Sequence, residues 1–459
     1  MEQKNQSSRL GEESIPKLLL YLAVPSVLAQ LVNLLYNIVD RVYIGHIEEI
    51  GASALTGVGI CAPIIMLASA FAMLACAGGS PRAAIYMGRK DNDTAERIMG
   101  NCFTLVLIFA VLLAVLCNIF AIPLLRLFGA SDKTLVYALD YLRIYTFGSI
   151  FIMTVLGMNP FITTQGFSKF SMLTTVIGAV INIILDPVFI FVFKLGVRGA
   201  AIATVLSQAV SAVWVLKFLT GEKSVLKLRR VNMRPEAKTV LPCLALGIAP
   251  FIMVGTEGIL SVSFTSSLAR YGGDLAVGAM TICTSINSLV FMPLNGLCQG
   301  GQPIMSYNFG AGNNERVKKA FYCIFGICVI ISVLFFAAVK LIPGIFVSAF
   351  TSDLELREKT VWALGIFMSC IFSCGFQISC QQSFIALGQA KVSLLLACLR
   401  KLILLIPLIF ILPVFFENKT FAVFLAEPVS DVIAAAVTAC IFFLRFNKTL
   451  EEGSLPQKQ

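Results

Sequence analysis

The sequence predicts an all-α integral membrane protein with twelve transmembrane helices in two six-helix lobes, and three observations support this. Of the 459 residues, 58% are hydrophobic and only 13% are charged, whereas about a quarter of an average soluble chain is charged. Twelve apolar runs are long enough to cross a bilayer. The second six runs repeat the first six.

The twelve apolar runs follow one another from residue 16 to residue 446. Each has roughly the 20 apolar residues that a transmembrane helix needs. The first begins after a polar stretch, Met1–Ile15, and is too long for the core of a signal peptide, so we expect it to be retained. In chain order the runs are 16–43, 53–80, 98–122, 134–159, 168–193, 197–219, 240–268, 276–303, 318–343, 358–385, 391–414 and 420–446.

One long polar stretch divides these runs six and six. It covers 217–239 and carries seven basic residues. We therefore expect an N-lobe over 1–216, a cytoplasmic linker over 217–239, a C-lobe over 240–446 and a cytoplasmic tail over 447–459.

Basic residues are distributed unevenly between the two sides of the predicted bundle. The side with the termini and the linker carries 22 Lys and Arg residues, including Lys4 and Lys458, against 10 on the other side. The positive-inside rule then places both termini in the cytoplasm of a multi-pass protein of the cell inner (plasma) membrane. The net charge of +10 thus indicates topology and contact with anionic lipids, not a nucleic-acid partner.

The two halves repeat at a single ungapped offset of 222 residues. Because each half has an even number of helices, both halves enter the membrane in the same direction. Parallel repeats of this kind are typical of alternating-access transporters, whose sites lie near mid-membrane. The matching pairs include Cys61 with Cys283, Cys76 with Cys298, Gly78 with Gly300, Pro81 with Pro303, Gly88 with Gly310, Gly166 with Gly388 and Lys169 with Lys391.

Several polar side chains interrupt the apolar runs of the first half. An ionised group at mid-membrane costs about 2.5–3.5 kcal/mol on insertion scales, so a carboxylate there needs a function or a partner. Asp40 precedes Arg41 and could form an ion pair, whereas Asp186 has no base within a helical turn in sequence. At i, i+3 or i, i+4 spacing the polar residues are Tyr36, Asn37 and Asp40, then Asn182 and Asp186, then Thr204 and Gln208.

The strongest of these candidates offer only oxygen ligands. Asp40 and Asp186 supply carboxylates, Asn182 an amide carbonyl and Thr204 a hydroxyl. This set suits a hard monovalent cation or a shared proton and lacks the nitrogen and sulfur ligands that zinc or copper prefers, so we expect no metal centre. If the two carboxylates meet, burial and mutual repulsion favour a proton on one of them.

The second half carries three acidic residues in its runs. Glu257 lies in 240–268, and Glu427 and Asp431 lie at i, i+4 in 420–446. They are candidates for a substrate contact or a second cation site. Asp431 is close to the cytoplasmic end of the last run, where its carboxylate could instead reach water.

Specific motifs on this duplicated plan resemble the multidrug and toxic compound extrusion (MATE) family, in particular its bacterial multidrug-efflux branch. They are Pro25 and Asp40 in the first run, "NIILDP" at 182–187 and "GAAIAT" at 199–204. The resemblance covers essentially the whole chain. It implies a V-shaped bundle around a central cavity and export of cationic or amphipathic drugs, driven by inward movement of protons or sodium ions.

The resemblance also assigns roles to individual residues. The cation site of its N-lobe corresponds to Asp40, Asn182, Asp186 and Thr204, and Tyr36 and Gln208 correspond to neighbouring polar positions. With Asn37, which shares a helical face with Tyr36 and Asp40, we expect these two residues to form a supporting polar network. Pro25 corresponds to a proline at which the first helix bends. Glu257 corresponds to an acid of a C-lobe site in another branch, but the second acid of that site is missing from 361–384, so Glu257 could instead contact a cationic substrate.

Three other functions remain open. A flippase for lipid-linked precursors would need a cationic cavity, and within the runs only Arg143, Arg400 and Lys401 could supply one. A membrane enzyme would need a catalytic set, and the chain has one histidine and no metal-ligand cluster. A channel would need a selectivity ring. We expect a monomeric antiporter that is not an enzyme, has no cofactor besides a coupling H+ or Na+, binds small organic cations or amphipathic drugs, and contacts membrane lipids.

Overall fold

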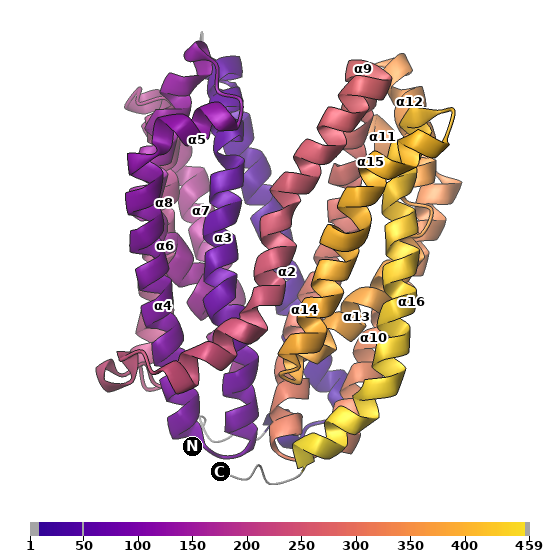
Figure 1. Cartoon of the computed structure of the whole chain (residues 1–459). Helices are drawn as coiled ribbons and strands as arrows, with labels where there is room; N and C mark the ends of the chain where they lie inside the picture. The colour runs from indigo at the N-terminus through magenta and orange to yellow at the C-terminus, as the bar shows by residue number, and fades with distance from the viewer. Residues whose placement is uncertain (1–8, 48–49, 455–459) are drawn as a thin grey trace.

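The computed structural model describes residues 9–47 and 50–454, which form two helical lobes that join at one end and diverge at the other (Figure 1). Lys4 and Lys458, counted above for the orientation, lie outside the described residues. The start of α2 and the end of α16 lie at the joined end (Figure 1). Both chain ends therefore leave the bundle on the same side.

The N-lobe is built from the first six long helices. Gly196, at φ 54°, separates the π-helical turn η1 from α8. The elements are α2 (Ile15–Gly45), α3 (Gly51–Gly88), α4 (Asn92–Ile119), α5 (Ala121–Leu127), α6 (Asp132–Thr164), α7 (Ser168–Pro187), η1 (Val188–Val192) and α8 (Val197–Thr220).

The C-lobe follows the same plan after a linker that contains the short helix η2 (Arg230–Met233). Its elements are α9 (Ala237–Gly310), α10 (Asn314–Leu341), α11 (Pro343–Ser348), α12 (Leu354–Phe367), η3 (Ile371–Ser373), α13 (Cys374–Ala386), α14 (Ala390–Cys398), η4 (Leu399–Leu405), α15 (Ile406–Phe415) and α16 (Lys419–Ser454). The last helix thus continues through most of the segment that we expected to be a tail.

The membrane-spanning segments agree with the predicted twelve once two breaks are taken into account. Ten helices are long and apolar enough to cross a membrane, and α12 with η3–α13, bent by 45°, makes eleven. Helix α9 breaks at Gly273 (φ 65°, ψ −167°) into a first arm, 237–272, and a second arm, 274–310, which adds the twelfth. The single run predicted at 358–385 is interrupted at 368–373. There the Ser373 hydroxyl donates to the Cys370 carbonyl, and such side-chain hydrogen bonds compete with the backbone hydrogen bonds of a regular helix.

The repeat seen in the sequence extends to the helix ends. Asp91 caps α4 by accepting from Thr94 N at 3.0 Å, and Asn313, 222 residues later, caps α10 in the same way. Ser131 and Asp353, at the same offset, cap α6 and α12. Gly166 and Gly388 both have positive φ, at 89° and 72°. The two halves therefore begin and end corresponding helices with the same local devices.

The lobes meet where helices of one half pack into the other. Leu18 and Leu22 of α2 belong to the apolar core of the C-lobe, whereas the second half of α2 packs on α7. In return Cys243, in the first arm of α9, belongs to the apolar core of the N-lobe. Pro25 is buried in α2 within this C-lobe contact, which continues to Gln30, whose side chain donates to Gln299 of α9. The bend expected there stays a prediction.

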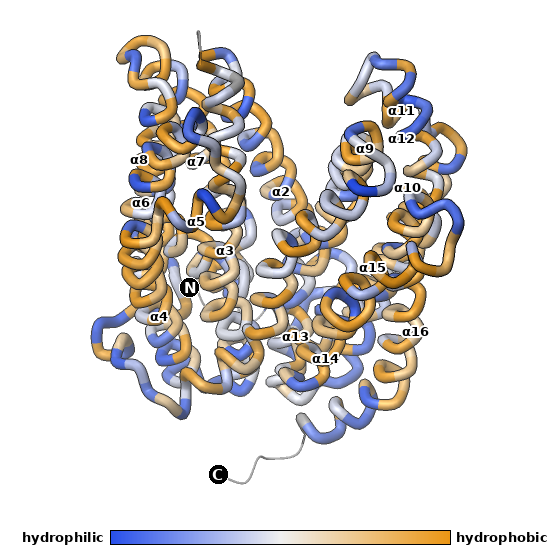
Figure 2. The backbone as a smooth tube through the Cα atoms, turned by 45° about the horizontal axis from the view of Figure 1, so that its top comes forward, coloured by the Kyte–Doolittle hydropathy of each residue, from blue (hydrophilic) through white to orange (hydrophobic). Residues whose placement is uncertain are grey.

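The outer surface is apolar over most of its height. Large hydrophobic side chains remain exposed on it, among them Phe147, Val213 and Leu444. Figure 2 shows hydrophobic residues along the helices, and hydrophilic residues in the linker and at the helix ends. This distribution is what a bilayer requires of the protein surface that contacts it.

Candidate functional site

The N-lobe holds a buried polar cluster on α2, α7 and α8. Asp40 lies near the end of α2, and its residue is 9% exposed. Asn182 and Asp186, one helical turn apart on α7, are fully buried, and Thr204 on α8 is 4% exposed. The four residues predicted as ligands therefore all face the interior of one lobe.

Hydrogen bonds join the members of this cluster. The Asn182 amide donates to Asp186 Oδ1 at 3.2 Å and lies 3.4 Å from Thr204 Oγ1. Asp40 lies against Asp186, so the two carboxyl groups meet as the sequence suggested. Directly after Asp186, Pro187 and the π-helical turn η1 end the regular helix, a feature that is frequent at functional sites.

Three oxygen atoms of the cluster have no hydrogen-bond donor in the part of the chain that the structure describes. They are Asp40 Oδ1, Asp186 Oδ2 and Asn182 Oδ1. Neither carboxylate forms an ion pair within residues 9–47 and 50–454. Buried oxygens in proteins normally have a donor or a cation, so these three atoms are exceptional among the described residues.

The other residues predicted for this site lie at different distances from it. Tyr36 is close to Thr204 and joins the cluster. Gln208 is half-buried one turn further along α8. The structure does not bring Asn37 to the cluster, because its exposed side chain donates to the Asn33 carbonyl of its own helix.

Two tyrosines beside the cluster were missed in the sequence. Tyr141 and Tyr145 of α6 are buried, and their rings stack with centroids 6.0 Å apart. Tyr141 lies close to both Asp40 and Tyr36. Their i, i+4 spacing within an apolar run was the available signal, because a buried tyrosine hydroxyl needs a polar neighbour.

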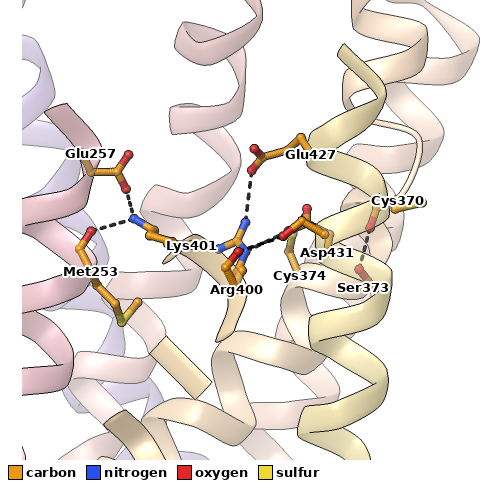
Figure 3. A network of polar contacts seen from close by, with 10 residues as sticks. Met253, Glu257, Cys370, Ser373, Cys374, Arg400, Lys401, Glu427 and Asp431 are labelled. Carbon is orange, nitrogen blue, oxygen red and sulfur yellow. Dashed lines mark hydrogen bonds and ion pairs between the residues drawn. The ribbon is translucent and has the colours of Figure 1, made fainter. Parts of the chain in front are cut away.

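The C-lobe holds a second buried cluster, shown in Figure 3. Arg400 donates to Asp431 at 2.8 Å and to Glu427 at 3.3 Å, both on α16. Lys401, the next residue in η4, donates to Glu257 on α9 and to the Met253 carbonyl. The three acidic residues predicted for this lobe are therefore all paired with bases.

The structure corrects the expectation for Asp431 and changes that for the two bases. The Asp431 side chain is 6% exposed and bound to Arg400, so the possibility that it reaches water is wrong. Arg400 and Lys401, which we considered as cations for a headgroup, lie at the centre of the helical run 390–415, and their side chains are 11% and 8% exposed. The sequence signal for these buried ion pairs was two adjacent bases within one apolar run and two acids within the next run.

The two clusters occupy equivalent helices but differ in charge. Counted within each half, both lie on the first, fifth and sixth membrane-spanning segments. As far as the chain is described, the N-lobe cluster has two carboxylates and no ion-paired base, whereas the C-lobe cluster has three carboxylates and two bases. Among the described residues no group of three His, Cys, Asp or Glu side chains could hold a metal ion.

Comparison with known proteins places both halves of the chain in one family. The MatE family model matches residues 25–188 and again 248–411. The multidrug export protein MepA of Staphylococcus haemolyticus is 24% identical over 446 residues, which is 97% of each chain. The structure of a MATE transporter in a bent conformation, 22% identical, superposes with a TM-score of 0.91 over 98% of this chain and 99% of that one.

A solved structure with higher identity is that of the MATE multidrug transporter DinF-BH in complex with a drug-like compound. It is 33% identical, has a TM-score of 0.89 and is matched over 98% of its length by 96% of this chain. Two matches to one family model and this identity over nearly the whole chain show that the protein is a multi-pass membrane protein of the MatE family.

Proposed function

We propose that this protein is a secondary active antiporter that exports cationic or amphipathic organic compounds in exchange for protons or sodium ions. The relatives that support the proposal are a multidrug export protein and a multidrug transporter solved with a drug-like compound bound. The single observation that carries the coupling mechanism is the set of three buried oxygens without donors on Asp40, Asn182 and Asp186.

In this mechanism the N-lobe cluster holds the coupling ion. A proton or a sodium ion would neutralise the negative charge of Asp40 and Asp186. If the cluster binds this ion in only one conformation of the protein, ion binding raises the population of that conformation. Oxygen ligands alone fit a hard monovalent cation or a proton. The α2 helix links the cluster to the C-lobe through its first half, so ion binding can reach the lobe junction.

The proposed orientation follows from the basic linker and termini. With these in the cytoplasm of the plasma membrane, the lobes diverge toward the outside, and the structure corresponds to a state ready to release substrate. Both clusters are completed by residues of a single chain, so a monomer is sufficient for transport. The anionic lipids of the inner leaflet would contact the linker.

The flippase alternative has less support. A pyrophosphate headgroup needs unpaired cations, whereas Arg400 and Lys401 are bound to three carboxylates. Arg143, the third basic candidate, is exposed. The relatives described above are drug transporters, which also speaks against an enzyme or a channel.

The test is efflux of ethidium, a fluorescent organic cation, from cells that lack their own pumps. We expect Asp186→Asn and Asp40→Asn to lower efflux to the level of cells without the protein, because each removes a charge that the coupling ion must neutralise. Asp140→Asn is the matched control, since Asp140 forms a partly exposed pair with Arg198 outside the cluster. Proton and sodium gradients, imposed separately on membrane vesicles, identify the ion. Full transport by both cluster variants would refute N-lobe coupling, and release independent of any gradient would refute antiport.

A further inference from the structure

The Lys401–Glu257 pair joins a buried cation to an exposed anion. The Lys401 side chain is 8% exposed, whereas the Glu257 side chain is 54% exposed. Figure 3 shows Lys401 extending from η4 to α9, where its ammonium meets one oxygen of Glu257 and the Met253 carbonyl, the latter at 2.6 Å. The second oxygen of Glu257 has no partner among the described residues and points away from Lys401.

The neighbouring pairs leave Lys401 with one counter-ion. Glu427 and Asp431 are bound by Arg400, and Glu257 is the only carboxylate within 4.0 Å of the Lys401 ammonium in the described part of the chain. Lys401 and Arg400 lie next to each other in the π-helical segment η4 but extend to different helices (Figure 3). The Lys401–Glu257 pair can therefore open without breaking the Arg400 pairs.

The surroundings of Glu257 admit a ligand. Glu257 belongs to the first arm of α9, which lies on the side of the C-lobe facing the N-lobe (Figure 1). A Cβ built on Gly255 would have no atom within 4 Å, and one built on Gly258 would reach only Pro63 of α3, at 4.0 Å. The Glu257 side chain is 54% exposed, and the two glycines beside it add no side chain that would cover the carboxylate.

The ligand chemistry favours an organic cation over a metal ion. A metal cation in a protein is usually surrounded by several oxygens, and Glu257 with the Met253 carbonyl supplies too few. An ammonium or a delocalised organic cation needs only one carboxylate and space for its apolar body. The ammonium group of Lys401 already binds Glu257 in this way, through one carboxylate oxygen.

We propose that Lys401 is a tethered cation that competes with cationic substrates for Glu257. This inference rests on the proposed function, because it concerns the substrates of that transport. While Lys401 occupies Glu257, an arriving cation meets a neutralised carboxylate. If the pair is closed nine-tenths of the time, about one-tenth of the molecules can bind the cation. The apparent Kd equals the intrinsic Kd divided by this fraction, so the apparent affinity falls about tenfold. Lys401 would thus keep substrate binding weak enough for release.

The test is equilibrium binding of tetraphenylphosphonium to the purified full chain in detergent, without any ion gradient. We expect Lys401→Met to bind this cation about tenfold more tightly than the wild type. Glu257→Gln in the Lys401→Met background should remove the gain. Lys401→Gln, whose amide can still donate to the Met253 carbonyl, should show the same gain and serves if Lys401→Met does not fold.

Lys391→Met is the matched control, because it removes the same charge from an exposed position on the neighbouring helix α14. It should leave the Kd unchanged. Four results would each overturn the proposal. Both Lys401 variants could bind the cation with the affinity of the wild type, or could fail to bind it. The gain in affinity could persist when Glu257→Gln is added, or the same gain could appear in Lys391→Met. Because no gradient is used, failure of antiport would appear in the efflux assay and not in this one.

Discussion

Arg400 binds two carboxylates of α16 while its own side chain is 11% exposed. A buried ion pair contributes little net stability when it is compared with apolar residues, but removal of one partner leaves a buried charge without compensation. Here the loss of one guanidinium would leave both Glu427 and Asp431 unpaired. Each carboxylate of the C-lobe cluster is thus paired with a base of that cluster, whereas neither carboxylate of the N-lobe cluster has an ion-paired base among the described residues.

The first prediction concerns this residue. Arg400→Met should lower the stability of the protein by about 3–5 kcal/mol, because two buried carboxylates lose their counter-ion. Thermal unfolding of the purified protein in detergent measures the change. Arg198→Met is the control, since Arg198 is 61% exposed in its pair with Asp140 and its loss should have little effect. Similar melting temperatures for the two variants would contradict the role given to Arg400.

The two clusters also differ in how far the sequence predicted them. The N-lobe residues stood out because Asn182 and Asp186 lie at i, i+4 within one apolar run. The C-lobe pairs join residues far apart in the chain, such as Lys401 and Glu257, so no local pattern shows them. The 222-residue repeat did not help either, because it aligns Asn182 and Asp186 with Leu404 and Leu408.

At the scale of elements, α3 and the second arm of α9 approach each other most closely through two glycines. A Cβ on Gly88 would overlap the Tyr307 carbonyl, and one on Gly310 would overlap the Ile85 carbonyl. Residue 85 corresponds to residue 307 and residue 88 to residue 310 at the offset of the repeat. The two contacts are therefore related by the internal symmetry, and they hold the lobes together at the joined end.

The second prediction tests this contact. Gly88→Ala and Gly310→Ala should each lower stability by about 1–3 kcal/mol, because the backbones must separate to admit a methyl group. Gly59→Ala in the same helix α3 is the control, since nothing lies within 4 Å of its Cβ position. That substitution should raise stability by about 0.5–1 kcal/mol through helix propensity. Thermal unfolding compares the three, and a stabilised Gly88→Ala would rule out the close contact.

The number of helices followed from the sequence, but their breaks did not. Runs of about 20 apolar residues and basic loops were enough to place twelve segments. Helix α9 covers 237–310 and is broken at one residue, Gly273, by the backbone conformation of that glycine. Amino-acid composition does not reveal such a conformation. At the break at 368–373 the Ser373 hydroxyl donates to the Cys370 carbonyl and the side chains of Ser369 and Cys370 contact each other, but Ser and Cys also occur within regular helices.

At the scale of the whole molecule, the linker between the lobes is fixed to the N-lobe. Gln165 accepts from the backbone N–H groups of Val225 and Leu226 at 2.7 and 2.9 Å. Thr104 donates to the Met233 carbonyl at 2.6 Å. Two further buried side chains of α4 bind the linker: Glu96 accepts from Lys227 N, and Asn101 accepts from Glu236 N. The linker should therefore move with the N-lobe, as should the start of α9, where Cys243 belongs to the N-lobe core.

The last prediction follows from this attachment. Spin labels on Lys133→Cys and Glu358→Cys report the separation of the two lobes, because both positions are exposed and lie near the starts of α6 and α12. The short helices α5 and α11, which precede α6 and α12, lie toward the diverging end (Figure 1). Labels on Lys133→Cys and Arg230→Cys report the position of the linker relative to the N-lobe. Double electron–electron resonance should show that a change of pH or of sodium concentration alters the first distance and leaves the second unchanged.

The labelling requires a background without accessible thiols. Cys440 is exposed, and Cys323, Cys370 and Cys398 are partly buried, so these four are replaced by serine. The variant must first be shown to retain ethidium efflux. If both distances change together, the linker is not part of the N-lobe body; if neither changes with either ion, the lobes do not respond to occupation of the N-lobe cluster. A change in the first distance alone means that the lobes move as two bodies, with the linker carried on the N-lobe.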